Sequence, residues 1–349
     1  MTTIKVVLLV AFITVATTRH AHAVGYPLFD SRETLGIVLE IPMRQLLRRA
    51  KTKPIVDGQL YYVDASGSEH VIDVRVTTRG KSRLEHCSFP PLSISLNPAQ
   101  VDATLFAGQS KLKIVTHCRN GSSYLRYLHQ EFGIYRAYNS LSEHSFRVRM
   151  LNVTYRDSQI ERRDDVRPAF FIESTAEVAE RLGMTTVKTK SIRPEQLDPG
   201  ESNIYELFQY MIANTDWSIL KSTGTEFCCH NGKVIAKPDA MDDWVVLPYD
   251  FDQAGIINTR YALPADELRL RSVRQRLYRG RCRHSDQLDE TVKLFNDRRQ
   301  EIQAALAPHA LTDRARRSAL GYLETFYTII NDSTKLKKEV ISVCRGGRS

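Results

Sequence analysis

Short alternating runs of apolar and polar residues in the first part of the chain predict β-strands. Apolar side chains recur at every second position in residues 35–41, and the runs 61–63 and 71–77 flank the turn-forming sequence Asp64-Ala-Ser-Gly-Ser68. This pattern predicts a strand and a hairpin, because side chains of a strand point alternately to its two faces. Further strands are expected at 92–96, 112–116, 146–155 and 169–172, with a short basic helix at 43–50 and a loop at 97–111.

Helical spacing is clearest in residues 122–141, where Leu125, Leu128, Phe132 and Tyr135 recur every three or four residues. Beyond residue 173 helices are expected at 175–182, 203–213, 265–278, 287–306 and 312–330, interrupted by a strand pair near 226–236 and 244–249. The pattern predicts an α+β chain. Residues 24–173 would be β-rich with one long helix, and residues 174–335 mainly helical with a strand insert. Residues 336–349 would form a basic, loosely ordered tail.

The first 23 residues have the three parts of a secretion leader. Lys5 supplies a positive charge, residues 6–16 form an apolar core, and Ala21-His-Ala23 offers a small-x-small cleavage site. The core is shorter than the roughly 20 residues that span a bilayer, and no second long apolar run follows. We therefore expect a secreted or periplasmic protein without a membrane span, with retention of the leader as an anchor as the alternative.

Composition and charge narrow the classes of partner. Hydrophobic residues make up 42% of the chain and charged residues 26%, as in globular proteins, which argues against wholesale disorder. The formal net charge is +9, and Lys5 and Arg19 of the leader contribute two of these charges. A basic protein favours anionic partners such as nucleotides. Because acids lie among the bases, and no zinc-finger or RNA-binding signature occurs, nucleic acid is not an expected partner.

Six cysteines follow the leader and predict up to three disulfides in an oxidising compartment. Cys87 and Cys118 end two strand-like segments and are expected to pair. Cys228 and Cys229 are adjacent, so we expect them to reach Cys282 and Cys344 instead of bonding to each other. A zinc site is the alternative, because histidines lie one or two residues from cysteines, although no Cys-x-x-Cys spacing supports it: His86, His117, His230 and His284.

Acidic residues in the second half form the most informative pattern. Residues 208–217 predict a helix that delivers Asn214 and Asp216 into a loop, and Asp250 and Asp252 follow a later strand. Magnesium prefers oxygen ligands shared with a phosphate. We therefore expect Asp250 and Asp252 to hold a metal ion, and Asp216 to orient or deprotonate a hydroxyl.

The first half supplies complementary cations. Arg79-Gly80-Lys81-Ser82 follows a strand, where glycine lets the backbone approach a ligand and the cations match its charge. Lys113 lies in a predicted strand, and Glu131 borders the buried face of the long helix. A strand lysine paired with a helix glutamate, both directed at phosphates, is the arrangement of protein kinases.

The chain resembles the spore-coat protein H family of atypical kinase-like proteins, and more closely its uncharacterised secreted bacterial relatives. The resemblance rests on Thr78-Arg-Gly-Lys-Ser82, Lys111-Leu-Lys-Ile-Val115, Phe146-Arg-Val-Arg149, Ile212-Ala-Asn-Thr-Asp216 and Pro248-Tyr-Asp-Phe-Asp252. It implies a two-lobed protein-kinase-like fold with Mg-ATP between the lobes. It further implies that Asp216 is the catalytic-loop acid, that Asp250 binds the metal, and that Lys113 and Glu131 form the lysine–glutamate pair.

The chain also departs from ordinary kinases. No His-Arg-Asp precedes Asp216, a single Arg-Gly replaces the several glycines, and Lys221 stands where kinases place a metal-binding asparagine. Asn231 is the substitute ligand that we predict, with the absence of this ligand as the alternative. The sequence leaves two main functions open. One is an envelope kinase that uses ATP and Mg²⁺ to phosphorylate a protein hydroxyl, and the other is a catalytically inactive kinase-like interaction module. A third, a disulfide-braced calcium-binding protein, would need Asp250 and Asp252 but not Lys113.

Overall fold

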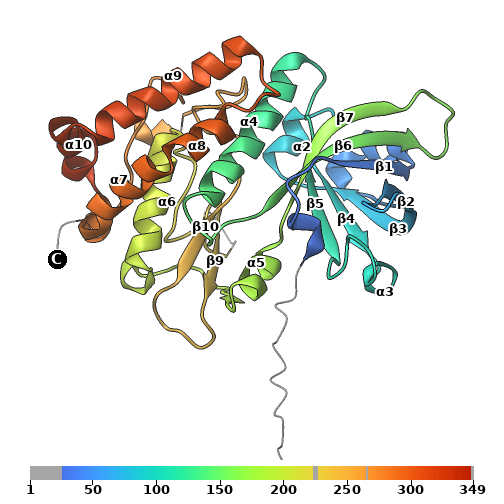
Figure 1. The fold of residues 1–349 in the computed structure, drawn as a ribbon, viewed down its shortest axis with the longest axis horizontal. Coiled ribbons are helices and arrows are strands. Elements are labelled where there is room, and N and C mark those ends of the chain that lie inside the picture. Colours follow the sequence, from blue (N-terminus) through green and yellow to red (C-terminus); the bar gives the residue numbers. More distant parts are fainter. Residues whose placement is uncertain (1–25, 223–226, 265, 347–349) are drawn as a thin grey trace, which may run out of the picture.

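The computed structural model describes residues 26–222, 227–264 and 266–346 (Figure 1). The predicted leader lies outside the described residues. The prediction of an α+β chain is confirmed, because a β-rich N-terminal region precedes helices that lie mostly toward the C-terminus. Within the described ranges, no helix combines the length and apolar character needed to cross a membrane.

Seven strands close into a barrel in the order β1-β2-β3-β4-β5-β7-β6. Neighbouring strands are antiparallel, apart from β1 and β6, which run parallel and complete the ring. The predicted alternation places the side chains of Leu39, Leu60 and Ile94 in a buried interior. The strands are β1 (Leu35–Ile41), β2 (Ile55–Val63), β3 (Glu69–Thr78), β4 (Leu92–Leu96), β5 (Lys111–Val115), β6 (Val148–Asp157) and β7 (Asp165–Ile172).

Four helices accompany the barrel strands in the chain. The long helix α4 lies between the barrel and the C-terminal helices (Figure 1), where it contacts β6, β7 and α8. A short helix stands within the predicted loop, where the side chain of Asn97 accepts a hydrogen bond from the backbone of Ala99. The helices are α1 (Met43–Arg48), α2 (Ser82–His86), α3 (Pro98–Val101) and α4 (Ser122–Asn139).

The C-terminal half packs helices around a second core, which includes Phe208, Phe251 and Phe326. A three-stranded sheet, ordered β10-β9-β8, lies within this half. The strands are β8 (Thr185–Thr186), β9 (Gly232–Ala236) and β10 (Val245–Pro248). The helices are α5 (Thr175–Arg181), α6 (Pro199–Met211), α7 (Leu288–Asp297), α8 (Arg299–Leu306), α9 (Asp313–Ile330) and α10 (Ser333–Glu339).

Short 3-10 turns connect several of these elements: Pro27–Phe29, Ala50–Thr52, Pro194–Gln196, Asp266–Leu268, Cys282–Gln287 and Ile341–Val343. Side-chain caps mark the starts of several helices. Ser174 and Glu177 form a capping box at α5, and the side chains of Asp198 and Thr312 cap α6 and α9. These caps satisfy backbone N–H groups that have no partner within the helix.

The helix predicted at 265–278 is wrong for the described residues, because only the turn Asp266–Leu268 is helical there. Two arginines of this segment, Arg274 and Arg276, instead donate hydrogen bonds to carbonyl groups of neighbouring elements. Arg276 donates to the carbonyl oxygens of Met211, at 3.1 Å, and Tyr322, at 2.7 Å. Because of these tertiary contacts, the segment forms an irregular connection packed between α6 and α9 instead of a helix.

Two predictions near the C-terminus also need correction. The helix expected at 287–306 is divided at Arg298 into α7 and α8. The tail is not loosely ordered over its described part, because α10 extends to Glu339 and the side chain of Asp332 caps its start. Val340 is buried, and Cys344 is bonded to Cys282.

Three disulfides join the six cysteines. The predicted pair Cys87–Cys118 is present. The prediction that Cys228 and Cys229 reach the other two cysteines is wrong, because Cys228 bonds to Cys229 and Cys282 bonds to Cys344. The backbones at Arg281 and Arg345 lie side by side, which brings their neighbouring cysteines together.

Candidate functional site

A cleft of about 350 Å³ opens where the barrel meets the C-terminal half. Its barrel side includes the segment after β3, together with Val115 and Ile172 from strand ends. Its other side includes the segments around Asn231 and Asp250, and α4 contributes Glu131 and Tyr135. The predicted site residues that line this cleft are Arg79, Gly80, Lys81, Ser82, Glu131, Asp216, Asn231, Asp250 and Asp252.

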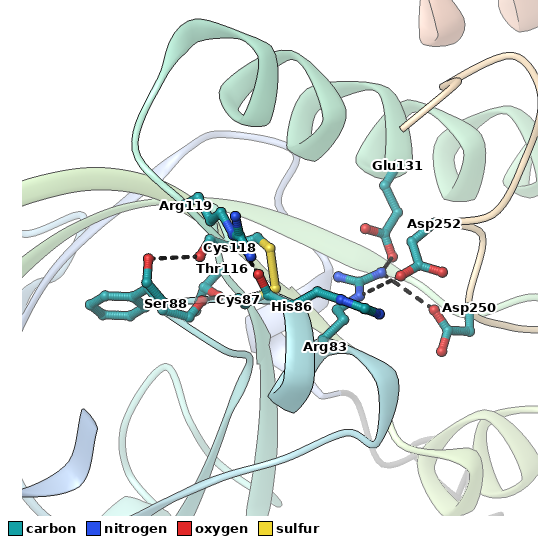
Figure 2. The surroundings of a disulfide bond; sticks show 11 residues. Arg83, His86, Cys87, Ser88, Thr116, Cys118, Arg119, Glu131, Asp250 and Asp252 are labelled. Atoms are coloured by element: carbon teal, nitrogen blue, oxygen red, sulfur yellow. Dashed lines mark hydrogen bonds and ion pairs between the residues drawn. A yellow bond between two sulfur atoms is a disulfide. The ribbon is translucent and has the colours of Figure 1, made fainter. Parts of the chain in front are cut away.

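Arg83, on α2, is the centre of the charge network in this cleft (Figure 2). Its Nε donates to Asp252 Oδ2 at 2.9 Å, and its Nη2 donates to Glu131 Oε1 at 2.7 Å and to Asp250 Oδ1 at 3.3 Å. The side chains of Arg83, Glu131 and Asp252 are almost fully buried, whereas that of Asp250 is 42% exposed. One guanidinium group therefore compensates three carboxyl groups, of which only Asp250 opens broadly to solvent.

Burial and mutual repulsion make two of these carboxyl groups easier to protonate. Burial raises the pKa of Glu131 to about 7, although the charge of Arg83 opposes the shift. Burial and the neighbouring Asp252 raise the pKa of Asp250 to about 6. Shifts of this kind are typical of functional sites, where buried acids are held close together.

Asp216 lies on the loop after α6, with its carboxylate oriented by two neighbours. His230 Nε2 lies 2.7 Å from Asp216 Oδ1, and Asn231 Nδ2 donates to Asp216 Oδ2 at 2.8 Å. The same amide also donates to the backbone oxygen of Asp216 at 2.7 Å. The side chain of Asp216 remains 43% exposed. A carboxylate that is both oriented and accessible can accept a proton from a hydroxyl group.

The segment after β3 approaches the cleft through a backbone conformation that suits glycine. Gly80 has a φ of 99°, a region that L side chains rarely adopt. Arg79 Nη2 donates to the hydroxyl of Tyr249 at 2.6 Å. Ser82 begins α2 directly after Lys81. The segment Arg79–Ser82 therefore brings both its backbone and its cationic side chains to the same side of the cleft.

Lys113, on β5, lies beside the cleft above the ring of Tyr249, with Nζ 5.1 Å from the ring centroid. Lys233 approaches the same ring at 5.6 Å. Burial, with the nearby charges of Arg79 and Lys233, lowers the pKa of Lys113 to about 7. No ion pair joins Lys113 to Glu131, whose carboxylate binds Arg83 instead.

The sequence does not indicate the contacts of several other residues of the cleft. Arg83 directly follows the Arg79–Ser82 motif, but nothing in the sequence indicates that it binds three carboxyl groups. The sequence indicates His230 only as a metal ligand beside a cysteine, because its bond to Asp216 depends on the loop that precedes β9. Lys233 lies on β9, and Tyr249 follows β10. Alternation along the strand pair could have indicated that both side chains share a face.

The acids have the chemistry of a magnesium site. Asp250 and Asp252 bind one guanidinium group and so lie within reach of a single cation. Mg²⁺ is commonly held by one or two carboxylates together with substrate phosphates, and the exposure of Asp250 suits that arrangement. In the described part of the chain, no group of three or more His, Cys, Asp or Glu side chains could hold a metal by itself.

The zinc alternative loses its cysteine ligands, because all six cysteines are disulfide-bonded. A search of protein-family models, curated proteins and solved structures finds no match to this chain. The resemblance to the spore-coat protein H family therefore stays a prediction from the sequence.

Proposed function

We propose that this protein is an extracytoplasmic kinase-like enzyme that binds Mg-ATP in the cleft and phosphorylates a protein hydroxyl. One observation carries the proposal. A single cleft gathers Asp216, Asp250 and Asp252 together with cations that include Arg79, Lys81 and Lys233, and Lys113 lies beside it against Tyr249. Phosphoryl transfer needs both charge types, because cations stabilise the phosphates while carboxylates hold the metal and orient the acceptor.

Each side chain has a role consistent with its contacts. Asp250 and Asp252 would hold Mg²⁺, which bridges and neutralises phosphate oxygens. Lys113 and Arg79 would contact the phosphates, and Gly80 would let the backbone approach them. Asp216, held by His230 and Asn231, would orient the acceptor hydroxyl. Asn231 would contribute by positioning Asp216 and, through its amide oxygen, as the predicted metal ligand.

Arg83 favours a second candidate function, a catalytically inactive interaction module. Its guanidinium group binds the two proposed metal ligands and also Glu131, the partner expected for Lys113. An internal cation at this position balances the carboxylates without a metal. Under the kinase proposal Arg83 would release Asp250 when Mg-ATP binds, whereas in an inactive scaffold the network would stay closed.

The disulfides support a location outside the cytoplasm. Bonds of this kind persist in oxidising compartments and are rare in the reducing cytosol, and they involve all six cysteines of this chain. We therefore propose that the protein and its acceptor are secreted or periplasmic.

Thermal unfolding tests the proposal directly. The oxidised protein would be melted alone, with Mg²⁺, and with Mg-ATP, beside Asp250→Ala and the exposed-acid control Asp242→Ala. A ligand at a hundred times its Kd stabilises by about 2.7 kcal/mol. We expect a nucleotide-dependent rise in Tm for the wild type and Asp242→Ala, and none for Asp250→Ala.

The outcomes separate the two candidate functions. A folded wild-type protein that shows no shift with Mg-ATP contradicts the kinase proposal and favours the interaction module. If Mg-ATP still raises the Tm of Asp250→Ala, the proposed role of Asp250 as a metal ligand is contradicted. Transfer of the γ-phosphate to protein, lost in Asp216→Asn while the shift remains, would support catalysis by this cleft.

A further inference from the structure

A second cavity, of about 210 Å³, lies at one end of the barrel. It is enclosed by α1, by the residues that follow Cys87 and precede Cys118, and by the connection from β6 to β7. None of the residues lining the cleft lines this cavity. We call it the Phe89 pocket, after the aromatic side chain on its wall. One buried water needs only about 10–15 Å³, so the pocket has room for a small organic molecule.

Two buried polar side chains line the Phe89 pocket, and each has one polar atom that is unpaired within the described part of the chain. His117 is 2% exposed and Tyr155 is 4% exposed. Neither His117 Nδ1 nor the Tyr155 hydroxyl has a hydrogen-bond partner among the described residues. The ring of Phe89 packs against both, with centroid distances of 4.9 Å to His117 and 4.7 Å to Tyr155. Buried polar atoms are nearly always paired, so two together indicate a missing partner.

The protonation states of these groups determine which partner they accept. Burial, reinforced by the charge of Arg167, lowers the pKa of His117 to about 4. Burial and the nearby Asp165 raise the pKa of the Tyr155 hydroxyl above its ordinary range. At neutral pH the inner wall therefore presents a neutral imidazole and a protonated phenol, which suit a hydroxyl or carbonyl group more than a charge.

The rim of the pocket has the opposite character. Arg162 and Arg163 are exposed, and within the described ranges neither forms an ion pair. The two carboxylates that also line the pocket already have partners. Asp157 accepts hydrogen bonds from the backbone of Arg44, at 2.8 Å, and of Gln159, at 3.0 Å. Asp165 pairs with Arg167 at 2.8 Å. The rim thus offers two guanidinium groups to an incoming anion.

We propose that the Phe89 pocket binds a small organic anion that carries a hydroxyl or carbonyl group, of about the size of a monosaccharide. The hydroxyl or carbonyl group contacts His117 and Tyr155, and the anionic group contacts Arg162 and Arg163. Met43, Leu47 and Phe89 supply apolar surface for the carbon body. The anionic group is a phosphate or a carboxylate, since guanidinium groups bind both in the same way.

Calorimetric titration of the oxidised protein tests this site, with glucose 6-phosphate and glucuronate as the phosphate and carboxylate probes. Glucose, which lacks the anion, and inorganic phosphate, which lacks the carbon body, serve as comparisons. We expect one anionic sugar to bind more tightly than both comparison ligands. Arg162→Gln with Arg163→Gln should weaken binding by about tenfold or more, and Tyr155→Phe by roughly two- to tenfold.

Matched variants locate the binding. Arg314→Gln with Arg317→Gln removes the same charge from exposed positions on α9, and Arg79→Gln alters the cleft. Both should leave the sugar affinity unchanged. The proposal is overturned if neither anionic sugar binds, if inorganic phosphate binds as tightly as the sugar phosphate, or if Arg79→Gln abolishes binding while the rim variant retains it.

Discussion

Arg83 supplies the positive charge that three carboxyl groups of the cleft share. Its partners lie 48, 167 and 169 residues away in the chain. Removing one member of a buried ion pair costs more than the pair contributes, because the remaining charge stays buried without compensation. The charge compensation of these three carboxyl groups therefore depends on Arg83. Its substitution should lower the stability of the protein and raise the affinity of the carboxylates for a metal ion.

We expect Arg83→Met to lower the free energy of unfolding by about 3–5 kcal/mol at pH 7, the usual cost of breaking a buried ion pair. Glu131 and Asp250 have pKa values of about 7 and 6, above their ordinary 4.5 and 3.8. The folded state therefore binds protons more readily than the unfolded chain does. The stability that protonation contributes is lost as the pH rises through these values.

The defect of Arg83→Met should consequently shrink as the pH falls from 7 to 5, because protonation neutralises the uncompensated carboxyl groups. Urea unfolding at both pH values would measure it, with Arg314→Met, an exposed arginine of α9, as the matched control. A loss of equal size at pH 7 and pH 5 would contradict the proposed role of charge.

Helix α4 connects the barrel to the C-terminal helices and carries Glu131 and Tyr135 into the cleft. Its close packing on α8 depends on Gly133. A Cβ atom at this position would lie 2.3 Å from the backbone oxygen of Ala305, whereas real Cβ atoms do not approach backbone below about 3 Å. Tyr135 accepts a hydrogen bond from the backbone N–H of Asp250, at 3.1 Å, so a shift of α4 would also disturb the proposed metal ligands.

Gly133→Ala should therefore lower the free energy of unfolding by about 1–3 kcal/mol through overpacking, although alanine favours helices. Gly321→Ala is the matched control, because Gly321 lies within α9 and nothing stands within 4 Å of its Cβ position. That substitution should raise stability by about 0.5–1 kcal/mol. Urea unfolding of both variants tests whether a Cβ atom at position 133 clashes with the backbone of Ala305. Equal stabilisation by the two substitutions would contradict the clash.

Two disulfides constrain long segments of the molecule. Cys87 and Cys118 are 31 residues apart and hold the end of α2, which bears Arg83 (Figure 2). Cys282 and Cys344 are 62 residues apart and hold the end of the chain against the start of the last four helices. The Cys228–Cys229 bond closes no such segment, because these residues are neighbours.

Replacing either long-range pair by alanine should cost about 4 kcal/mol, slightly more for Cys282 and Cys344, since a longer closed loop restricts the unfolded chain more strongly. The Cys228→Ala with Cys229→Ala variant should lose far less. Chemical unfolding of the three double variants under oxidising conditions measures the loss in free energy of unfolding for each and so ranks the three disulfides. Equal losses for all three would exclude loop closure as the main source of stabilisation.

Local patterns in the sequence determined most of the secondary structure. The alternation in residues 35–41 and 71–77 and the helical spacing in 122–141 correspond to β1, β3 and α4, because side-chain periodicity depends only on neighbours along the chain. The pairing of Cys87 with Cys118 was predicted correctly, although only Cys118 comes after a strand, whereas Cys87 directly follows helix α2. The acids of the cleft were recognisable as candidates from their positions after a helix and a strand.

Only the tertiary structure decided which of these residues meet. The partners of Arg83, the bond between Cys282 and Cys344, and the unpartnered His117 and Tyr155 depend on elements far apart in the chain. The segment around Arg276 has the composition of a helix, yet contacts with Met211 and Tyr322 hold it in another conformation. Burial and long-range charge compensation set these features, and neither leaves a periodic signal in the sequence.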